Sequence, residues 1–496
     1  MSLVRASWLA VLILAAAGLA SAPTPGRAQE APALAVSPLP VDDEILLWIL
    51  SGAGDHGLAR PGDADLGARL ASPSPEAVLI ARQALVSRLL DHAIALSGRR
   101  LDPTAISREW SVRPLPRDIA GEFDRARRDG RLAGWFAALA PDDPRYRALT
   151  VERRRYQTMV EAGGWSAIDP GKPLSQEALD PASPPSPEAR DPRVAALRDR
   201  LEAEGYQLAA VEDRSVFDAG LASALTLFQR RHGLAGDGVL GPATLAALNV
   251  PAAARLGQID ANLERWRWTG TPPADRVEVD IAAAGATLFR AGQPVMVMRA
   301  IVGAPRTRTP LFSARIEAVV FNPAWHVPAK IAFGEILPKA ARDPGYLKRG
   351  GFTLSGGRLV QAPGEGNALG LIKFDLPNPF GVYLHDTSSR GLFARERRTL
   401  SHGCMRLQKP RELAVALLGG AWDEAAVDAA IAAGVTRRVP LGEPLPVFTT
   451  YHSTLPGEDG AVIFAPDVYG WDARLIPILQ RLAQVDRAQG GVGGCH

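Results

Sequence analysis

One stretch decides how this chain is interpreted, and it reads Leu400-Ser401-His402-Gly403-Cys404-Met405-Arg406-Leu407-Gln408-Lys409-Pro410. It contains Cys404, one of only two cysteines in 496 residues, directly after a His-Gly step. A second histidine, His385, lies 19 positions upstream at the end of the apolar run Val382-Tyr383-Leu384. A thiol, an imidazole within reach and a flexible glycine beside the thiol are the parts of a cysteine nucleophile site.

The thiol needs activation, because a free cysteine has a pKa of about 8.5 and is a poor nucleophile when protonated. His385 is the candidate base. Pro410, Leu413 and Leu417 predict a helix just after the motif, whose positive end would favour the thiolate. Gly403 lets the backbone turn sharply, so that amides near Cys404 could point at a developing oxyanion.

Other kinds of site fit the sequence less well. Cys404, His402 and His385 cluster without a C-x-x-C or H-x-x-x-H partner, so no metal site is expected. The chain has no G-x-S-x-G elbow for a serine nucleophile. We therefore expect neither a metal nor an organic cofactor.

The hydrophobic pattern predicts an α+β multidomain protein. From Arg276 onward apolar residues alternate, and strands are expected at 277–281, 295–298 and 316–321. Residues 275–450 are thus predicted to form a mainly-β, sandwich-like catalytic domain. Residues 333–370 lack alternation and are rich in Gly, Pro and Lys, which predicts an inserted, lid-like subdomain. Residues 451–496 form a C-terminal segment.

The part of the chain before the sheet is predicted to be helical. Leu85, Leu89, Ala93 and Leu96 recur at helical spacing within a predicted helical scaffold domain, residues 29–169. Residues 170–192 are a Pro-rich linker. Residues 193–255 carry three apolar stripes that suit a three-helix bundle.

This bundle has a recognisable motif, which reads Ala224-Leu225-Thr226-Leu227-Phe228-Gln229-Arg230-Arg231-His232-Gly233-Leu234 and then Asp237-Gly238-Val239-Leu240-Gly241-Pro242-Ala243-Thr244. It resembles the helical peptidoglycan-binding module of bacterial wall enzymes, which implies binding to glycan strands. A three-helix spacer without a ligand is the alternative.

The N-terminus predicts export. Arg5 precedes an apolar and small-residue run of 13 residues, Trp8 to Ala20, and Gly26-Arg27-Ala28 offers a cleavage site. Residues 1–28 are therefore predicted to be a signal peptide, with an uncleaved anchor as the alternative. The mature protein is expected in the periplasm, wall-associated and without an integral membrane span. The net charge of +3 argues against nucleic-acid binding, and Cys495 is interpreted as incidental.

The catalytic region resembles a known family. His385-Asp386-Thr387 and Ser401-His402-Gly403-Cys404-Met405-Arg406 look like the signature of the L,D-transpeptidase (YkuD-type) catalytic domain. Thr309-Pro310 and the segment from Asn322 to Pro328 match other parts of that family. The order of scaffold, binding module and catalytic domain resembles its large periplasmic branch.

The resemblance implies a role for each matching residue. Cys404 would be the nucleophile and His385 the base, oriented by the backbone carbonyl of Asp386. Backbone amides of Gly403 and Cys404 would form the oxyanion hole. Ser401 and His402 would support the site. The candidates for substrate binding are Arg406, Tyr383, Trp325 and His326. A structural role for Arg406 and core packing for Trp325 and His326 remain alternatives.

The implied reaction is acyl transfer between peptidoglycan stem peptides. Cys404 would attack the bond before the terminal D-alanine of a tetrapeptide stem, and an amine of a neighbouring stem would resolve the thioester into a 3→3 cross-link. Water as acceptor would give a carboxypeptidase, and a lipoprotein would give a ligase. A wall-binding protein with a decayed site is a further alternative. The family also implies inhibition by carbapenem β-lactams at Cys404. Met405 departs slightly from the family signature, since relatives often carry Ile or Val at this position.

Overall fold

The computed structural model describes residues 43–58, 63–175, 191–457 and 459–490. The predicted signal peptide, most of the predicted linker and Cys495 lie outside these ranges. Within them, no helix combines the length and the apolar character needed to cross a membrane.

The N-terminal region is helical, as predicted. Its helices are α1 (Asp43–Ser51), η1 (Gly52–His56), α2 (Asp63–Leu70), α3 (Pro75–Leu96), η2 (Pro103–Ala105), α4 (Ile119–Arg128), α5 (Leu132–Ala137) and α6 (Pro144–Glu161). Capping explains where α3 begins, because the Ser74 side chain accepts from Ala77 N–H and Pro75 occupies the first turn. The four residues of the predicted apolar stripe on α3 are all buried.

Three further helices follow, α7 (Arg193–Ala203), α8 (Ala219–Arg231) and α9 (Pro242–Leu248), and they share one apolar core. Motif residues hold them together. The Gln229 side chain is 1% exposed, donates to Asp237 at 2.6 Å and to Thr244 at 3.0 Å, and accepts from Gly238 N–H at 2.8 Å. These polar motif residues therefore have a folding role of their own.

The helix α10 (Ala252–Thr269) was not foreseen from the sequence. It is buried on most sides, and its buried arginines form ion pairs with buried carboxylates of this helix or of the C-terminal segment. Arg265 contacts Asp472 at 2.5 Å, and Arg267 contacts Glu264 at 2.5 Å. Because these charges are neutralised locally, the helix can lie in the interior despite a polar sequence.

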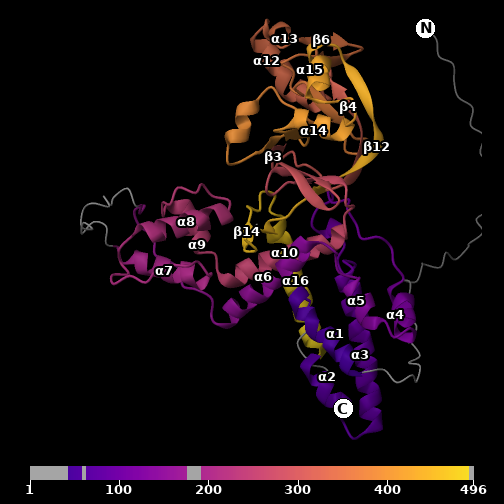
Figure 1. Ribbon diagram of the computed structural model, residues 1–496, viewed down its shortest axis with the longest axis vertical. Coiled ribbons are helices and arrows are strands. Elements are labelled where there is room, and N and C mark those ends of the chain that lie inside the picture. The colour runs from indigo at the N-terminus through magenta and orange to yellow at the C-terminus, as the bar shows by residue number, and fades with distance from the viewer. Residues whose placement is uncertain (1–42, 59–62, 176–190, 458, 491–496) are drawn as a thin grey trace, which may run out of the picture. The chain divides into compact units, whose positions relative to one another are not determined.

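A nine-stranded sheet forms the predicted β-rich domain. Its strands are β1 (Arg276–Asp280), β2 (Gly285–Arg290), β3 (Gln293–Gly303), β4 (Ser313–Phe321), β8 (Ile372–Asp375), β9 (Leu384–His385), β10 (Thr399–Ser401), β11 (Met405–Leu407) and β12 (Arg437–Thr450). Their order is β10-β3-β11-β9-β8-β4-β12-β1-β2. Apolar residues of α14 (Pro410–Leu418) and α15 (Glu424–Ala432) pack into the core of this sheet (Figure 1).

The pairing of the sheet closes on itself, a detail that the predicted sandwich-like arrangement did not include. β2 pairs with β3 as well as with β1. The long strand β3 makes this possible: residues 293–299 pair with β2, whereas residues 300–303 pair with β11 and β10. One strand thus serves two parts of the sheet, which alternation alone cannot reveal.

The predicted insertion is structured. After β5 (Trp325–His326) come α11 (Ala329–Ile331), a π-helix η5 (Ala332–Ile336), α12 (Leu337–Arg342), α13 (Tyr346–Arg349), β6 (Phe352–Ser355) and β7 (Arg358–Gln361). The three strands form their own sheet in the order β5-β7-β6, and the segment has its own small apolar cluster (Figure 1). A separate core of this kind distinguishes it from a simple loop.

The C-terminal segment contains β13 (Thr454–Pro456), β14 (Val462–Phe464) and α16 (Trp471–Gly490), and the short helix η6 (Arg390–Ala394) lies earlier, between β9 and β10. Tyr451, Tyr469, Trp471 and Leu475 are buried in the same apolar core as the nine-stranded sheet. This segment therefore contributes directly to the domain that carries Cys404.

Candidate active site

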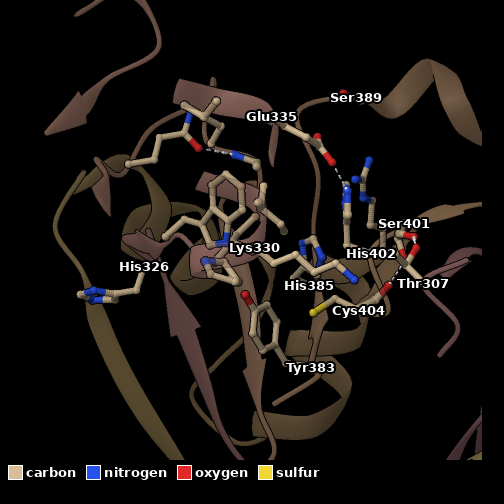
Figure 2. A pocket seen from close by; sticks show the side chains of 18 of the residues that line it. Thr307, His326, Lys330, Glu335, Tyr383, His385, Ser389, Ser401, His402 and Cys404 are labelled. Carbon is tan, nitrogen blue, oxygen red and sulfur yellow. Dashed lines mark hydrogen bonds and ion pairs between the residues drawn. The ribbon is translucent and has the colours of Figure 1, made fainter. Parts of the chain in front are cut away.

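A pocket of about 1330 Å³ opens where the sheet meets the inserted segment. It is lined by Cys404, His385, Tyr383 and Arg406 from the sheet, and by Lys330, Glu335 and other residues of the insertion. Figure 2 shows Tyr383, His385 and Cys404 together at the floor of this pocket. The sequence-predicted nucleophile and base therefore share one cavity.

Strand pairing brings these residues together. β9 and β11 are parallel neighbours, with Met405 opposite Leu384 and Arg406 opposite His385. Met405 N–H also donates to the carbonyl of Tyr383 at 3.0 Å. Residues 19 positions apart in sequence thus lie side by side at one edge of the pocket.

The turn that carries Cys404 is fixed by hydrogen bonds. Ser401 Oγ donates to the carbonyl of Cys404 at 2.5 Å and accepts from Gly403 N–H at 3.1 Å. Thr309 Oγ1 donates to Gly403 O at 2.8 Å, and Thr307 Oγ1 donates to Ser401 O at 2.8 Å. Gly403 adopts φ of 115°, a conformation that favours glycine. Ser401 is thus a support of the turn.

This bonding affects the predicted oxyanion hole. The N–H of Gly403 is already used by Ser401 Oγ, so it does not point freely into the pocket. Within the described part of the chain, the N–H of Cys404 has no recorded acceptor. Of the two amides expected from the sequence, Cys404 N–H fits the role and Gly403 N–H does not in this state of the turn.

His385 is 4% exposed and is held in its neutral form. Burial, and after it the positive charge of Arg406, lower the pKa of His385 to about 3, although the backbone carbonyls of Asp386 and Leu369 act in the opposite direction. Nδ1 of this ring is buried and makes no hydrogen bond of good geometry to any described residue. The orienting bond to the Asp386 carbonyl is therefore weak in this structure.

The Cys404 thiol is also held in its neutral form. Burial raises the pKa of Cys404, although Tyr383, Lys373 and Arg406 act in the opposite direction. The expectation that the following helix would favour thiolate is wrong here. The strand β11 separates Cys404 from α14, which begins at Pro410, and a helix field is felt mainly within about one turn of its end.

Asp386 supports the loop beside His385. Its buried carboxylate accepts from Leu371 N–H at 2.9 Å and from Arg390 at 2.7 Å. The side chain therefore ties residues 370–371 to the end of β9. Any influence of Asp386 on the imidazole of His385 therefore comes through the backbone of Asp386.

Two cationic residues, Lys373 and Arg406, lie on either side of His385 in the sheet, and Arg406 lines the pocket. The registers place Lys373 of β8 opposite His385, and His385 opposite Arg406. The Arg406 Nε is buried and has no hydrogen-bond partner among the described residues, and burial lowers the pKa of its guanidinium. Lys373 Nζ lies 4.6 Å from the centre of the Tyr383 ring. An unpaired cation in a pocket is suited to a carboxylate ligand.

Lys373 was missed from the sequence. The short strand Ile372–Asp375 has an alternating burial pattern, and that alternation is the one signal that could have placed Lys373 on the less buried face of this strand. Its register with His385 is a long-range property that the local sequence does not encode.

The other sequence-predicted candidates occupy different parts of the pocket. Trp325 lines it and packs near Phe352 of the insertion, with ring centres 6.4 Å apart. His326 is exposed and lies on the far side of the pocket from Cys404 (Figure 2). His402 faces the insertion, where its Nε2 lies 2.5 Å from Oε1 of Glu335. Glu335 was not identified from the sequence.

No group of three or more His, Cys, Asp or Glu side chains is arranged to hold a metal ion in the described ranges.

Three segments of the chain match known domain families. Residues 274–428 match the L,D-transpeptidase catalytic domain (YkuD), residues 190–248 match a putative peptidoglycan binding domain, and residues 43–152 match a scaffold domain.

Individual proteins are similar over part of their length. A putative L,D-transpeptidase from Haemophilus influenzae is 34% identical over 209 residues, which cover 38% of this chain and 42% of that protein. The match thus spans less than half of the relative. An L,D-transpeptidase structure from Mycobacterium smegmatis is 19% identical, with a TM-score of 0.21, over 36% of this chain and 60% of that one. L,D-transpeptidase 3 from Mycobacterium tuberculosis, in complex with a faropenem-derived adduct, is 16% identical, with a TM-score of 0.20, over 36% and 62% of the two chains.

Proposed function

We propose, on the premise that residues 274–428 belong to the L,D-transpeptidase catalytic domain family, that this chain cross-links peptidoglycan through Cys404. The observation that carries the proposal is the parallel pairing of β9 with β11, which puts His385 beside the turn bearing Cys404 in a large pocket. A nucleophile and base on adjacent strands have the proximity that acyl transfer requires.

The donor step begins with the neutral pair. His385 takes the thiol proton as Cys404 Sγ attacks the carbonyl between the third residue of the stem and its terminal D-alanine. The C–N bond breaks, D-alanine leaves with the proton from His385, and a thioester remains. The N–H of Cys404 is the candidate donor to the oxyanion.

The acceptor step resolves the thioester. A side-chain amine of a neighbouring stem attacks the same carbonyl carbon, the C–S bond breaks, and the thiolate regains a proton. The product is a 3→3 cross-link between two stems. Water in place of the amine would give a shortened stem instead.

Arg406 supports recognition of the stem. Peptidoglycan stems carry carboxylates, and Arg406 lines the pocket and lies opposite His385 on the neighbouring strand. A carboxylate bound there would neutralise Arg406, which is the second cause of the low pKa of His385. Substrate binding would thereby make His385 a stronger base at the moment when it is needed.

The inserted segment fits the role of a lid. It has its own core and lines the pocket with Lys330, Glu335, Lys339 and Arg349. Closure over the thioester would exclude water and favour the amine as acceptor.

The remaining regions fit work at the cell wall. Residues 190–248 match a putative peptidoglycan binding domain, and we propose that they hold a glycan strand near the pocket. The enzyme would act in the periplasm after export. Carbapenems would acylate Cys404, since their strained carbonyl mimics the donor.

Purified mature protein and Cys404→Ala should be incubated with disaccharide-tetrapeptide, and the products should be analysed by mass spectrometry. We expect cross-linked dimers that lack one D-alanine from the wild type alone. Tripeptide without dimers would show that the protein is a carboxypeptidase. Unchanged substrate in both samples would indicate a wall-binding protein without this activity.

A further inference from the structure

We propose that His402 and Glu335 form a second acid–base pair, which deprotonates the acceptor amine in the cross-linking step. The inference rests on the proposed transpeptidase function. It assigns the two half-reactions to different histidines of the same pocket: His385 serves the thiol, and His402 serves the incoming amine.

The geometry of the pair is that of a base and its orienting carboxylate. Nε2 of His402 lies 2.5 Å from Oε1 of Glu335, and Figure 2 shows the two side chains meeting across the pocket. A carboxylate at Nε2 fixes the tautomer that carries its proton there, which leaves Nδ1 as the acceptor. It also stabilises the imidazolium that forms when Nδ1 takes up a proton.

The two histidines differ in access to solvent. His385 is 4% exposed, whereas the side chains of His402 and Glu335 are 41% and 46% exposed. A base for the acceptor must pass its proton to water between turnovers, and His402 can do so. The hydroxyls of Ser401, Thr307 and Thr309 donate to the carbonyls of Cys404, Ser401 and Gly403, and these bonds hold the backbone on either side of His402.

Glu335 comes from the inserted segment, on the one-turn π-helix Ala332–Ile336. Such turns interrupt a helix and often occur at functional sites. Here the π-helix places the Glu335 carboxylate next to His402. The pair therefore forms only when the insertion lies against residues 401–404.

The charges of the pocket lining point to the same pair. Among the described residues that line the pocket, the acidic ones are Glu109 and Glu335, and the cationic ones are Arg306, Arg308, Lys330, Lys339, Arg349 and Arg406. Glu109 lies 3.6 Å from Arg308. Glu335 is the acidic group whose recorded partner is a histidine, so it is the favoured place for an ammonium to approach.

The proton balance is complete. The acceptor enters as R–NH3⁺ and gives one proton to Nδ1 of His402, which becomes an imidazolium next to the Glu335 carboxylate. The neutral amine attacks the thioester carbon and the C–S bond breaks. The second proton moves from the nitrogen to the Cys404 thiolate by way of His385, and His402 then releases its proton to water.

The test is Glu335→Gln in the full chain, because a glutamine oxygen still accepts the Nε2–H bond and keeps the insertion in place. Thioester formation is measured as D-alanine release in a single turnover, and dimer formation is measured with a stem acceptor. We expect thioester formation within about twofold of wild type, and dimer formation lower by about 10- to 100-fold, at or below the low end of general-base effects. Glu317→Gln is the matched control, since Glu317 is 47% exposed and lies outside the pocket lining.

Methoxyamine distinguishes a role of Glu335 in deprotonating the acceptor from a role in holding the insertion in place. This small amine is unprotonated at neutral pH, so it needs no base before it attacks the thioester. With methoxyamine as acceptor, Glu335→Gln should resolve the thioester at the wild-type rate. An equal loss with methoxyamine, or no loss with the stem amine, would overturn the proposal. Absence of a thioester in the wild type would instead overturn the transpeptidase function itself.

Discussion

At the scale of single residues, Cys404 and His385 are both uncharged at rest. Burial raises the pKa of the thiol and lowers the pKa of the imidazole to about 3. In the mechanism proposed above, Cys404 would therefore be activated during attack by transfer of its proton, because a preformed thiolate–imidazolium pair is not favoured.

This charge state predicts an unusual pH dependence. A base that must be neutral works above its pKa, and His385 remains neutral well below its ordinary pKa of about 6.5. We expect acylation of Cys404 by a carbapenem to stay constant within about twofold from pH 7 down to pH 5, whereas an ordinary histidine would lose roughly tenfold per unit below its pKa. Stopped-flow fluorescence measures the rate, and His385→Asn should lower it by at least about 100-fold at every pH. A fall that follows a group titrating near pH 6.5 would contradict this assignment.

The sequence predicted some of these residues and could not predict others. Cys404 and His385 stood out because a thiol beside a glycine and a histidine after an apolar run are local features. Lys373 and Glu335 join them only through strand register and through the path of the insertion, which are long-range properties. The depressed pKa of His385 depends on burial and on Arg406 across the sheet.

At the scale of elements, the loop after β3 holds the nucleophile turn in place. Thr309 and Thr307 donate to the carbonyls of Gly403 and Ser401. This loop is itself held by Tyr469 of the C-terminal segment, whose hydroxyl donates to Gly303 O at 2.7 Å and accepts from Thr309 N–H at 3.0 Å. The C-terminal segment thus helps to position the turn that carries Cys404, through the contacts of Tyr469 with the loop after β3.

Removal of this one hydroxyl should be costly. Tyr469→Phe leaves a buried N–H and a buried carbonyl unpaired, so the free energy of unfolding should fall by about 1–3 kcal/mol. Urea denaturation followed by tryptophan fluorescence measures the loss. Tyr346→Phe is the control, because Tyr346 is half-buried and no hydrogen bond of its hydroxyl is recorded in the described part of the chain. Equal stability of the two variants would show that Tyr469 does not hold the loop.

Elements with a strong local pattern were predicted, and those set by tertiary pairing were not. Alternation located β1, β3 and β4, and periodicity located α3 and α8. The closure of the sheet through β3 was not visible, since it depends on one strand pairing with three others. The helix α10 escaped notice because its buried Arg265 and Arg267 look like surface residues until their partners are known.

At the scale of the whole molecule, segments assigned to separate domains from the sequence share one core. Trp110 comes from the N-terminal helical region, and its ring centre lies 5.0 Å from that of Trp268 and 5.2 Å from that of Trp471. The backbone beside it is joined to the sheet as well, because Ser111 N–H donates to Leu311 O at 2.8 Å. Contacts of this kind between residues 150 or more positions apart cannot be read from local sequence, and they make the full chain the proper object for experiments.

The central claim is that Cys404 carries the donor stem as a thioester. Intact-protein mass spectrometry of the full mature chain tests it, with a tetrapeptide donor whose side-chain amine is acetylated so that no acceptor is present. We expect the wild type to gain the mass of the donor minus D-alanine, and Cys404→Ala to gain nothing. Release of D-alanine by a wild-type protein that never carries the adduct, or an equal adduct on Cys404→Ala, would contradict the account.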